Sequence, residues 1–428
     1  MKEKFKLTSL EKSWILYDIG NSAFILLVST LLPIYFNALA SGAGISESDY
    51  LAYWGYAGSV ATILVAIIGP ICGAMADWNY KKPLFLGSLA LGAVGCAVLG
   101  VAWGWLSFLV IFVIARVGYN CANVFYDSML PEITTEERMD NVSTMGYALG
   151  YIGSVIPFAL CLVLVLLHGT FGMSQVTALI ISFIITAVWW VVCSVPLAKR
   201  YKQTAFHENG GKPVGESFKQ LARTFKEAKK HKHIFVYLIA FFFIDGVYTI
   251  IDMATAYGTA LGLDTTGLLL ALLVTQIVAF PFAILFGRLA SKYDTGLLIK
   301  ICILAYTGIA AFAIFLATQW QFWTLAVLVG MFQGGIQALS RSYLAKIIPA
   351  EQSGEYYGLM DICGKGASFV GTTLVAVVSQ ATEGMTFHLF GLPVVNTGVA
   401  VGSIGILFII GFILFCKADK LNKARQTA

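Results

Sequence analysis

Four apolar stretches of this chain carry polar and charged side chains on one helical face. The first opens at residues 17–24, where Asp18, Asn21 and Ser22 recur at the spacing of about one helical turn. A carboxylate about five residues into a membrane helix is costly in contact with lipid, so it is expected to face protein or water. Such side chains can bind a polar solute through charge and hydrogen bonds. The simpler alternative is a residue at the membrane surface that caps the helix.

Three later stretches repeat this pattern, and their polar residues are further candidates for binding a solute. They are Arg116, Tyr119, Asn120 and Asn123 in the second stripe, Asp245, Tyr248, Thr249 and Asp252 in the third, and Gln333, Gln337 and Arg341 in the fourth. The alternative for any single stripe is hydrogen bonding between neighbouring helices, which contributes about 1 kcal/mol in membranes.

Another pair of opposite charges lies in an apolar stretch near the C-terminus. Asp361 and Lys365 are one helical turn apart, so they are expected to form a structural ion pair that neutralises both. Contact with the substrate is the alternative role. Gly364 and Gly366 flank the lysine and indicate close packing of this helix against a neighbour.

A short link between two apolar stretches carries Gly73, Asp77, Lys81 and Lys82. The glycine permits close approach of two helices. The aspartate can accept hydrogen bonds from a helix N-terminus, and the lysines can bind a helix C-terminus. These four residues are therefore predicted to form a conformational latch that is separate from the substrate site.

Several kinds of chemistry find no support in the sequence. It has no G-x-x-x-x-G-K-[ST] motif for binding phosphate, and no pair of nucleophile and base stands out, so we expect no enzyme. The 8 cysteines form no C-x-x-C motif, so we expect neither a metal site nor a cofactor. Uphill movement of a solute would therefore use an ion gradient, with a proton or sodium as the coupling ion, or an exchange of solutes.

The composition indicates which elements must position these side chains. Of 428 residues, 58% are hydrophobic and only 12% are charged, whereas about a quarter of a soluble domain is charged. The apolar stretches, most of them long enough to cross a bilayer as a helix, cover residues 14–39, 51–76, 83–102, 105–129, 142–167, 175–198, 233–260, 267–290, 297–317, 321–345, 357–379 and 397–416. The chain is therefore predicted to be an all-α polytopic membrane protein with twelve transmembrane helices.

The basic residues predict how these helices are oriented. All but three of the 28 lysines and arginines lie at the termini, in the even-numbered links or at the ends of the stretches beside those links, and the exceptions are Arg116, Arg341 and Lys365. Because basic residues favour the cytoplasmic side, both termini are expected there. The net charge of +5 thus reflects topology and requires no nucleic-acid partner.

A long polar segment divides the chain into two similar halves. We expect a six-helix bundle over residues 1–198, a cytoplasmic linker over 199–232 and a second six-helix bundle over 233–428. In the linker, Phe218, Leu221 and Phe225 share a helical face, which indicates either a helix on the membrane surface or a solvated connection.

Similar residues of the two halves are separated by a constant number of positions. Glu137, Gly150 and Ser154 correspond to Glu351, Gly364 and Ser368 with a shift of 214 residues. Transporters are often built from such repeats, with the substrate site at their interface near the middle of the membrane. The four polar stripes fall on the first and fourth helices of each half, so we expect them to surround one cavity.

Longer motifs resemble a known family. The pattern Gly73-x-x-x-Asp77 with Lys81 and Lys82 is similar to the cytoplasmic signature of the major facilitator superfamily. Residues 17–24, 124–131 and 333–342 resemble its "unknown major facilitator" branch, which is related to yeast vacuolar amino-acid effluxers of autophagy. The resemblance covers nearly the whole chain.

This resemblance implies a facilitator fold and movement of a solute, with an amino acid as one candidate. The chain departs from the family pattern in two places. Ile19 stands where tryptophan is common, which would reshape the floor of the cavity, and Asn79 and Tyr80 stand where an arginine is usual in the latch.

The leading functional hypothesis is a transporter that moves a small polar or zwitterionic solute by alternating access. Its support is a predicted cavity that holds both signs of charge, because an arginine can bind a carboxylate and an aspartate can bind an ammonium group. An exporter of amphipathic drug-like or lipid-like compounds is the alternative, motivated by the 14% aromatic content. A receptor or scaffold that transports nothing is a third class. We expect a monomer in a prokaryotic cytoplasmic membrane.

The predicted orientation can be tested by cysteine labelling. Cysteines introduced at Ser46 and Thr265 should react with an impermeant reagent added outside intact cells, whereas one at Gln203 should not, because only Gln203 lies in an even-numbered link. The unmodified chain measures the background from its own cysteines. Labelling at Gln203 from outside would overturn the orientation.

Overall fold

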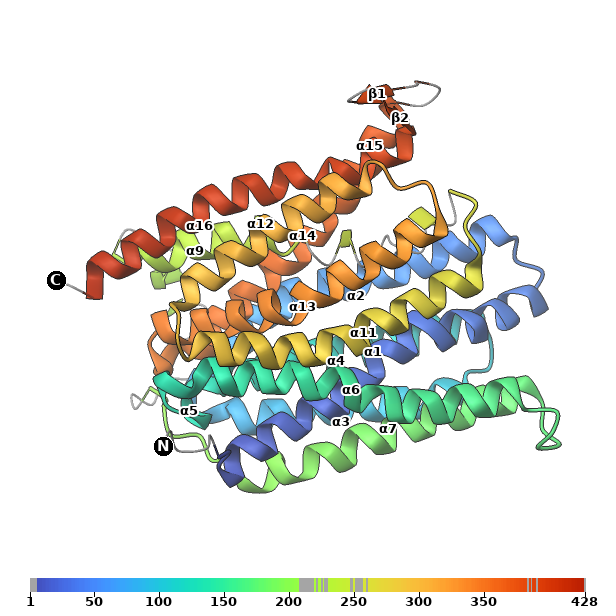
Figure 1. Ribbon diagram of the computed structural model, residues 1–428. Coiled ribbons are helices and arrows are strands. Elements are labelled where there is room, and N and C mark those ends of the chain that lie inside the picture. Colours follow the sequence, from blue (N-terminus) through green and yellow to red (C-terminus); the bar gives the residue numbers. More distant parts are fainter. Residues whose placement is uncertain are drawn as a thin grey trace. The chain divides into compact units, whose positions relative to one another are not determined.

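The computed structural model describes residues 6–207, 219–220, 222–224, 226, 230–246, 249–250, 257–258, 261–382, 385, 387–389 and 392–426. Helices account for most of them (Figure 1).

Up to the linker the elements are α1 (Ser9–Gly42), α2 (Glu47–Met75), η1 (Ala76–Tyr80), α3 (Lys81–Val98), η2 (Leu99–Val101), α4 (Trp105–Ser128), α5 (Leu130–Ile133), η3 (Glu136–Arg138), α6 (Met139–Leu166) and α7 (Gln175–Arg200). After it come α9 (Lys232–Ile244), α11 (Thr265–Ala290), α12 (Thr295–Ala313), α13 (Gln319–Ile347), η4 (Ala350–Gln352), α14 (Ser353–Ala381), β1 (Phe387–Leu389), β2 (Leu392–Val394), α15 (Asn396–Gly402) and α16 (Ile404–Gln426).

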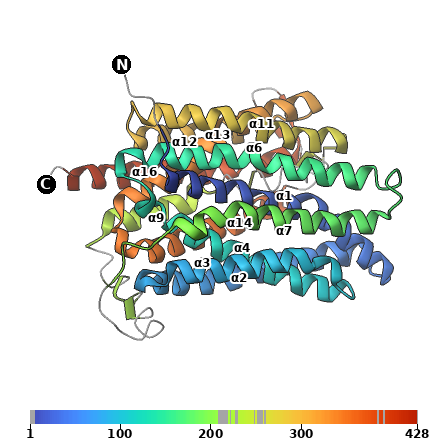
Figure 2. The same ribbon diagram turned by 90° about the horizontal axis from the view of Figure 1, so that it is seen from below.

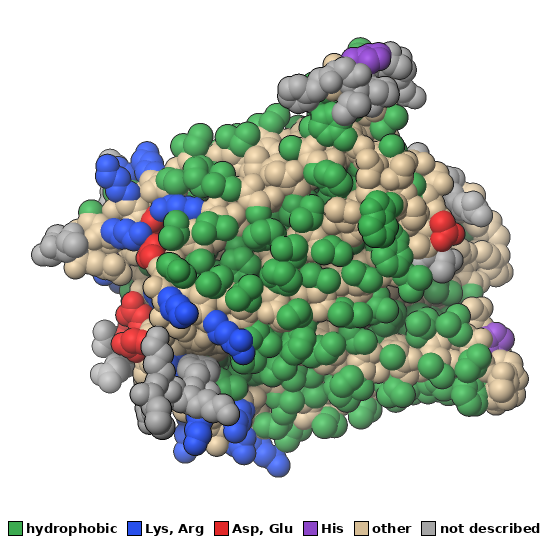
Figure 3. All heavy atoms as spheres, viewed as in Figure 1, with side chains coloured by type: hydrophobic (Ala, Val, Ile, Leu, Met, Phe, Trp, Pro, Cys, Tyr) green, Lys and Arg blue, Asp and Glu red, His purple; other side chains and the backbone are tan. Residues whose placement is uncertain are grey.

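The length of these helices confirms a polytopic membrane protein. Among the described residues, 10 helical segments are long and apolar enough to cross a membrane, and one of them, Tyr53–Val101, contains both α3 and most of α2. Helix α9 is shorter, since part of the seventh predicted stretch lies outside the described residues. Figure 3 shows hydrophobic side chains spread over much of the visible face, as contact with lipid requires.

The chain forms two compact units whose limits differ slightly from the two sequence halves. Unit 1 contains Met1–Thr135, Leu149–Leu221 and Ala350–Gly358, and unit 2 contains Glu136–Ala148, Ala222–Pro349 and Leu359–Ala428. The first turns of α6 and α14 therefore belong to the unit formed mainly by the opposite half. The division into two six-helix bundles and a linker stays a prediction.

In unit 1, helices pack closely where small residues face each other. Helix α3 lies along α4, and α1 lies along α7 (Figures 1 and 2). A Cβ atom on Gly118 would come within 2.4 Å of the backbone nitrogen of Gly92, so α3 and α4 touch through their backbones. Close backbone contact of this kind strengthens dispersion packing between membrane helices.

In unit 2, α11 lies along α13 and α9 lies along α16 (Figure 1). A Cβ atom on Gly330 of α13 would lie 2.8 Å from the carbonyl oxygen of Thr275 of α11, which again indicates backbone contact. A small antiparallel hairpin, in which β1 pairs with β2, precedes α15. The apolar pattern did not predict this hairpin, because strands of three residues leave no periodic signal.

Candidate functional site

The polar stripes of the first and fourth apolar stretches meet in unit 1. Asn21 of α1 donates a hydrogen bond from Nδ2 to Oδ1 of Asn123 on α4, at 2.7 Å. The hydroxyl of Tyr17 donates to the same oxygen at 3.3 Å. Two amides and a phenol thus connect α1 to α4, and Asn21 is only 4% exposed.

Asp18 and Ser22 lie on the same face of α1, toward α6. The Ser22 hydroxyl donates to the backbone carbonyl of Asp18 at 2.7 Å. A Cβ atom on Gly150 of α6 would lie 2.9 Å from that hydroxyl, so α6 packs directly on the stripe. Asp18 is 7% exposed and therefore faces the protein, as the cost of a carboxylate in lipid requires.

Arg116 brings a positive charge into the interior of unit 1. Its guanidinium carbon lies 5.9 Å from the centroid of the Tyr119 ring, at the outer limit of a cation–π contact. Its terminal nitrogen NH1 is buried and has no hydrogen-bond partner among the described residues. The Tyr119 ring also contacts Phe24 and Trp190, at centroid distances of 5.1 and 5.8 Å. Asn120, the remaining residue of this stripe, is half-buried.

The stripe of the seventh stretch packs against glycines of α14 in unit 2. Cβ atoms built on Gly364 and Gly371 would lie 2.5 Å from Oδ2 of Asp245 and 2.2 Å from Oγ1 of Thr249. Both polar side chains therefore rest directly on the α14 backbone. Tyr248 and Asp252, the other two predicted members of this stripe, lie outside the described residues.

Asp361 and Lys365 form an ion pair on α14, between Lys365 Nζ and Asp361 Oδ1. The second carboxylate oxygen, Oδ2, is buried and has no hydrogen-bond partner within the described part of the chain. Gly366 contacts Phe242 of α9, so both glycines that flank the lysine lie in close helix contacts.

The fourth stripe, on α13, is buried in unit 2. Gln333, Gln337 and Arg341 are 6%, 8% and 3% exposed. Arg341 donates from Nε to the hydroxyl of Ser143 at 2.9 Å, and its guanidinium lies 4.4 Å from the centre of the Tyr147 ring. Arg341 thus holds the first turns of α6 against α13.

The predicted latch residues lie around the end of α2. A Cβ atom on Gly73 would come within 2.2 Å of the carbonyl oxygen of Gly354, so α2 and α14 touch through their backbones. The Asp77 carboxylate accepts hydrogen bonds from the backbone N–H groups of Gly354 and Glu355, at 2.8 and 2.9 Å. These N–H groups belong to the first turn of α14, which has no intrahelical acceptors for them and attracts negative charge.

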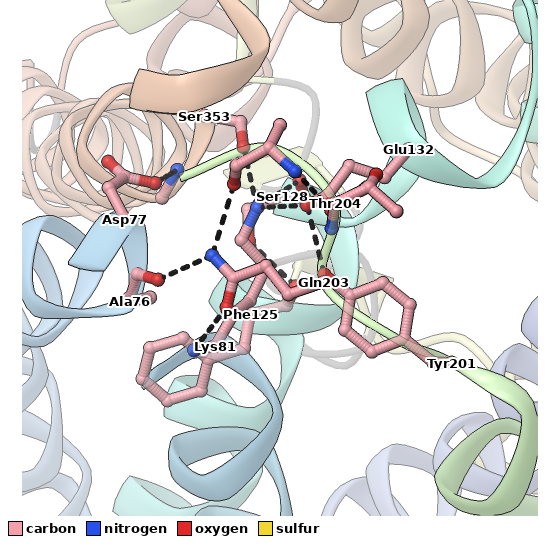
Figure 4. A network of polar contacts seen from close by, with 12 residues as sticks. Ala76, Asp77, Lys81, Phe125, Ser128, Glu132, Tyr201, Gln203, Thr204 and Ser353 are labelled. Atoms are coloured by element: carbon pink, nitrogen blue, oxygen red, sulfur yellow. Dashed lines mark hydrogen bonds and ion pairs between the residues drawn. The ribbon is translucent and has the colours of Figure 1, made fainter. Parts of the chain in front are cut away.

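A buried ion pair lies beside this contact (Figure 4). Lys81 donates from Nζ to Oε1 of Glu132 at 2.6 Å, and the two side chains are 0% and 1% exposed. The same ammonium donates to the Ser353 hydroxyl at 2.8 Å and to the carbonyl oxygen of Ser128, at the end of α4, at 3.2 Å. Lys81 therefore contacts the C-terminus of α4 and also forms an ion pair with the carboxylate of Glu132.

The start of the linker forms a strap over the ion pair, which we define as residues 201–207. The Tyr201 hydroxyl donates to Oε1 of Glu132 at 2.9 Å, and the backbone nitrogen of Thr204 donates to Oε2 at 2.6 Å (Figure 4). Gln203 donates to the carbonyl oxygen of Ala76 and accepts from the backbone nitrogen of Lys81.

The remaining contacts of the strap involve Lys82 and His207. Lys82 donates from Nζ to the carbonyl oxygen of Tyr201 at 2.9 Å. The backbone nitrogen of His207 donates to the carbonyl oxygen of Asp77. Burial lowers the pKa of the His207 imidazole, while nearby Glu351 opposes this shift. Periodicity did not identify Glu132 or the strap, because their partners are far away in sequence.

A second buried cluster occupies equivalent positions in unit 2. With the offset of 214 residues, Thr295, Ser342 and Lys346 correspond to Lys81, Ser128 and Glu132. All three donate to the Asp140 carboxylate, at distances of 2.6, 2.6 and 2.5 Å. This cluster could have been predicted from the offset of 214 residues. The basic residue, however, is Lys81 in the first half and Lys346 in the second, where Lys346 corresponds to Glu132.

Asn79 and Tyr80 stand where an arginine is usual in the family pattern of the latch, and the backbone turns sharply at this point. Asn79 has φ of 67° and ψ of 23°, in the left-handed region that asparagine tolerates better than most residues. Asparagine at this position therefore fits the turn between α2 and α3, and the buried cation of the latch is Lys81.

Comparison with known proteins places the chain in a family. Residues 9–410 match the family model described as vacuole effluxer Atg22 like. The chain belongs to this Atg22-like family. It is 39% identical over 416 residues to the uncharacterized transporter YxiO of Bacillus subtilis (strain 168), which is of the major facilitator type, and the match covers 96% of this chain and 94% of YxiO. It is 22% identical over 445 residues to autophagy-related protein 22 of Eremothecium gossypii, covering 89% and 87% of the two chains.

Solved structures identify the fold of this Atg22-like chain. The major facilitator superfamily transporter FucP in its outward conformation matches with a TM-score of 0.68 at 16% identity, covering 96% of this chain and 97% of FucP. An outward-facing bacterial homologue of ferroportin gives the same TM-score at 13% identity, covering 96% and 98%. The predicted major facilitator fold and the resemblance to the Atg22 branch are therefore confirmed.

The close contact at Gly73 can be tested by adding a methyl group. Gly73→Ala should destabilise the Atg22-like protein by about 1–3 kcal/mol, because the backbone of Gly354 leaves no room for a Cβ atom. Gly87→Ala in α3 is the matched control, since a Cβ atom there meets nothing within 4 Å. Equal midpoints of thermal unfolding for the two variants would contradict the contact.

The buried ion pair predicts a large effect for Glu132→Gln. This change leaves the Lys81 ammonium buried without a counter-ion and should cost about 3–5 kcal/mol. Lys423→Gln is the control, because the Lys423 side chain is 50% exposed in its pairs with Asp294 and Asp419, and Asp419 keeps its pair with Lys300. Exposed pairs contribute about 0–1 kcal/mol. Thermal unfolding in detergent measures both, and cleavage within the linker by a protease should increase only for Glu132→Gln.

Proposed function

We propose that this Atg22-like chain is a secondary transporter that moves a small polar or zwitterionic solute, such as an amino acid, by alternating access. Membership of a family of major facilitator transporters supports movement of a solute. The family is described as one of vacuole effluxers, which supports export of a solute and does not specify which solute.

The observation that carries the choice of solute is Arg116. Its nitrogen NH1 is buried and has no hydrogen-bond partner among the residues that the structure describes, and a guanidinium inside a membrane helix is costly unless an anion compensates it. A carboxylate matches the planar fork of the guanidinium. The polar residues of the same unit, Asp18, Asn21 and Asn123, would bind the ammonium and other polar groups of the solute.

The latch fits the conformational part of this proposal. Asp77 binds the first turn of α14, and Lys81 binds Glu132 beneath the strap. Movement of α14 away from α2 would expose a buried carboxylate and break two hydrogen bonds. We propose that this contact stabilises one conformational state and must open for the transporter to reach the other.

The exporter of amphipathic compounds remains the second candidate. It is favoured by the aromatic rings of Phe24, Tyr119 and Trp190, which pack together close to Arg116. Aromatic faces bind apolar parts of a ligand, and an amphipathic anion would use both the rings and the guanidinium.

We also propose a location and a state of assembly. The bacterial relative YxiO favours a prokaryotic cytoplasmic membrane, and the basic residues favour a cytoplasmic position for both termini. A monomer is the proposed unit of transport, with energy from a proton or sodium gradient or from exchange of solutes.

The role of Arg116 can be tested by ligand binding to the purified protein. We expect at least one of the twenty amino acids to raise the midpoint of thermal unfolding, and the amide of the same amino acid, which lacks the carboxylate, not to do so. Arg116→Gln should weaken binding about 10–100-fold, since a hydrogen bond to a charged group contributes about 1.5–3 kcal/mol.

Arg288→Gln is the control for this test, because Arg288 is exposed at the end of α11. Unchanged affinity in Arg116→Gln would remove the arginine from the site. Tight binding of a neutral amphipathic compound to wild type and variant alike would favour the exporter. Proteoliposomes that show no uptake or efflux of any stabilising compound would favour a receptor or scaffold.

A further inference from the structure

The linker reaches the latch a second time beyond the strap, through the side chain of Gln220. This side chain is 9% exposed, and it has a hydrogen-bond partner at each end of its amide. The indole nitrogen Nε1 of Trp78 donates to Oε1 of Gln220 at 3.1 Å. The amide nitrogen Nε2 of Gln220 donates to Oε2 of Glu355 at 2.8 Å. One linker side chain therefore joins the turn between α2 and α3 to the first turn of α14, within unit 1.

The chemistry of the two partners fixes the orientation of the Gln220 amide. An indole nitrogen can only donate a hydrogen bond, and an ionised carboxylate can only accept one. A glutamine offers an acceptor and a donor side by side, so it satisfies both partners at once. Glutamate would lack the donor and lysine would lack the acceptor.

The hydrogen bond to Glu355 stabilises a contact that otherwise brings two negative charges together. Glu355 is 0% exposed, and its carboxylate lies within electrostatic range of Asp77. Asp77 in turn binds the backbone N–H groups of Gly354 and Glu355. Two carboxylates thus share one helix N-terminus, where they repel each other although the helix dipole favours each of them. A donor from the linker compensates part of this cost, because a buried carboxylate needs hydrogen bonds in place of water.

The strap and Gln220 meet at the same side chain of the turn. The ring of His207 lies 5.1 Å from the ring of Trp78, between centroids, and its backbone nitrogen donates to the carbonyl oxygen of Asp77. The strap binds Glu132 and residues 76–82. The strap therefore anchors the linker on the turn between α2 and α3, and Gln220 extends that anchor to α14.

We propose that Gln220 bridges the latch in its closed state, so that the linker holds α14 against α2 together with Asp77. Opening the latch must then break one of the two bonds of this bridge as well as the two hydrogen bonds of Asp77. The linker thereby determines how readily the latch opens. This inference rests on the proposed alternating access only for the part that the latch plays in transport.

Hydrogen exchange followed by mass spectrometry, on the full-length protein in lipid nanodiscs, tests the bridge. The backbone N–H groups of Gly354 and Glu355 donate to Asp77, so their exchange with solvent reports whether the latch is closed. The backbone N–H groups of Thr204 and Ala205 donate to Glu132, so their exchange reports the strap separately.

Gln220→Met keeps the length of the side chain and removes both hydrogen bonds of the bridge. We expect exchange at Gly354 and Glu355 to become about 10-fold faster, the effect of losing one hydrogen bond to a charged group, and exchange at Thr204 and Ala205 to keep its wild-type rate. Gln220→Glu should have a larger effect, because it places another carboxylate against Glu355.

Gln175→Met is the matched control, because Gln175 is exposed at the start of α7, and it should exchange like the wild type at all four positions. Trp78→Phe tests the other end of the bridge, since it removes the indole N–H and keeps an aromatic ring. It should also accelerate exchange at Gly354 and Glu355. The double variant with Gln220→Met should exchange no faster there than Gln220→Met alone, because both changes interrupt one bridge.

Three outcomes would overturn the proposal. They are unchanged exchange at Gly354 and Glu355 in Gln220→Met, an equal acceleration at Thr204 and Ala205, and additive effects of Trp78→Phe and Gln220→Met in the double variant.

The exchange experiment does not require transport, so its failure differs from a failure of the proposed function. If proteoliposomes moved no solute while exchange behaved as expected, the transport function would fail and the bridge would stand. If Gln220→Met moved solute at the wild-type rate, the linker would not control the latch during transport, and that part of the proposal would be wrong.

Discussion

A buried charge has no water to solvate it, and this constraint governs which residues of the chain meet. Lys81 and Glu132 illustrate the solution in unit 1, because each is almost fully buried and each is the counter-ion of the other. The backbone N–H groups of Thr204 and Ala205 in the strap donate hydrogen bonds to the second carboxylate oxygen of Glu132, Oε2. Asp77 uses the N-terminus of α14 in the same way. Each buried charge therefore fixes the position of a segment that is distant in sequence, and the ends of α2, α4, α7 and α14 are held together by polar contacts that lipid cannot replace.

Close backbone contact is the second requirement, because short polar side chains reach their partners only where helices touch. Gly73 and Gly354 bring α2 against α14, which lets Asp77 reach the first turn of that helix. Gly364 plays the corresponding part for Asp245 in unit 2. Glycine inside a helix costs about 0.5–1 kcal/mol relative to alanine, so these positions are useful only where the contact compensates the loss. The polar stripes and the glycines are thus two aspects of one packing arrangement.

The sequence was sufficient for the helices and for the polar faces, since both depend on local periodicity. Asn21 and Asn123 were expected to share a site, and they form a hydrogen bond. Contacts between segments that are distant in the sequence were harder to predict. Glu132 looks like an ordinary acid at the end of a helix, and Tyr201 and Thr204 look like linker residues, because no spacing rule connects positions that are about 70 residues apart. Asp140 could have been found through the internal repeat, which places Lys346 at the position equivalent to Glu132. The contact of Asp245 with α14 could not have been found in this way. A polar stripe shows which face of a helix is polar, but it does not show which helix packs on that face.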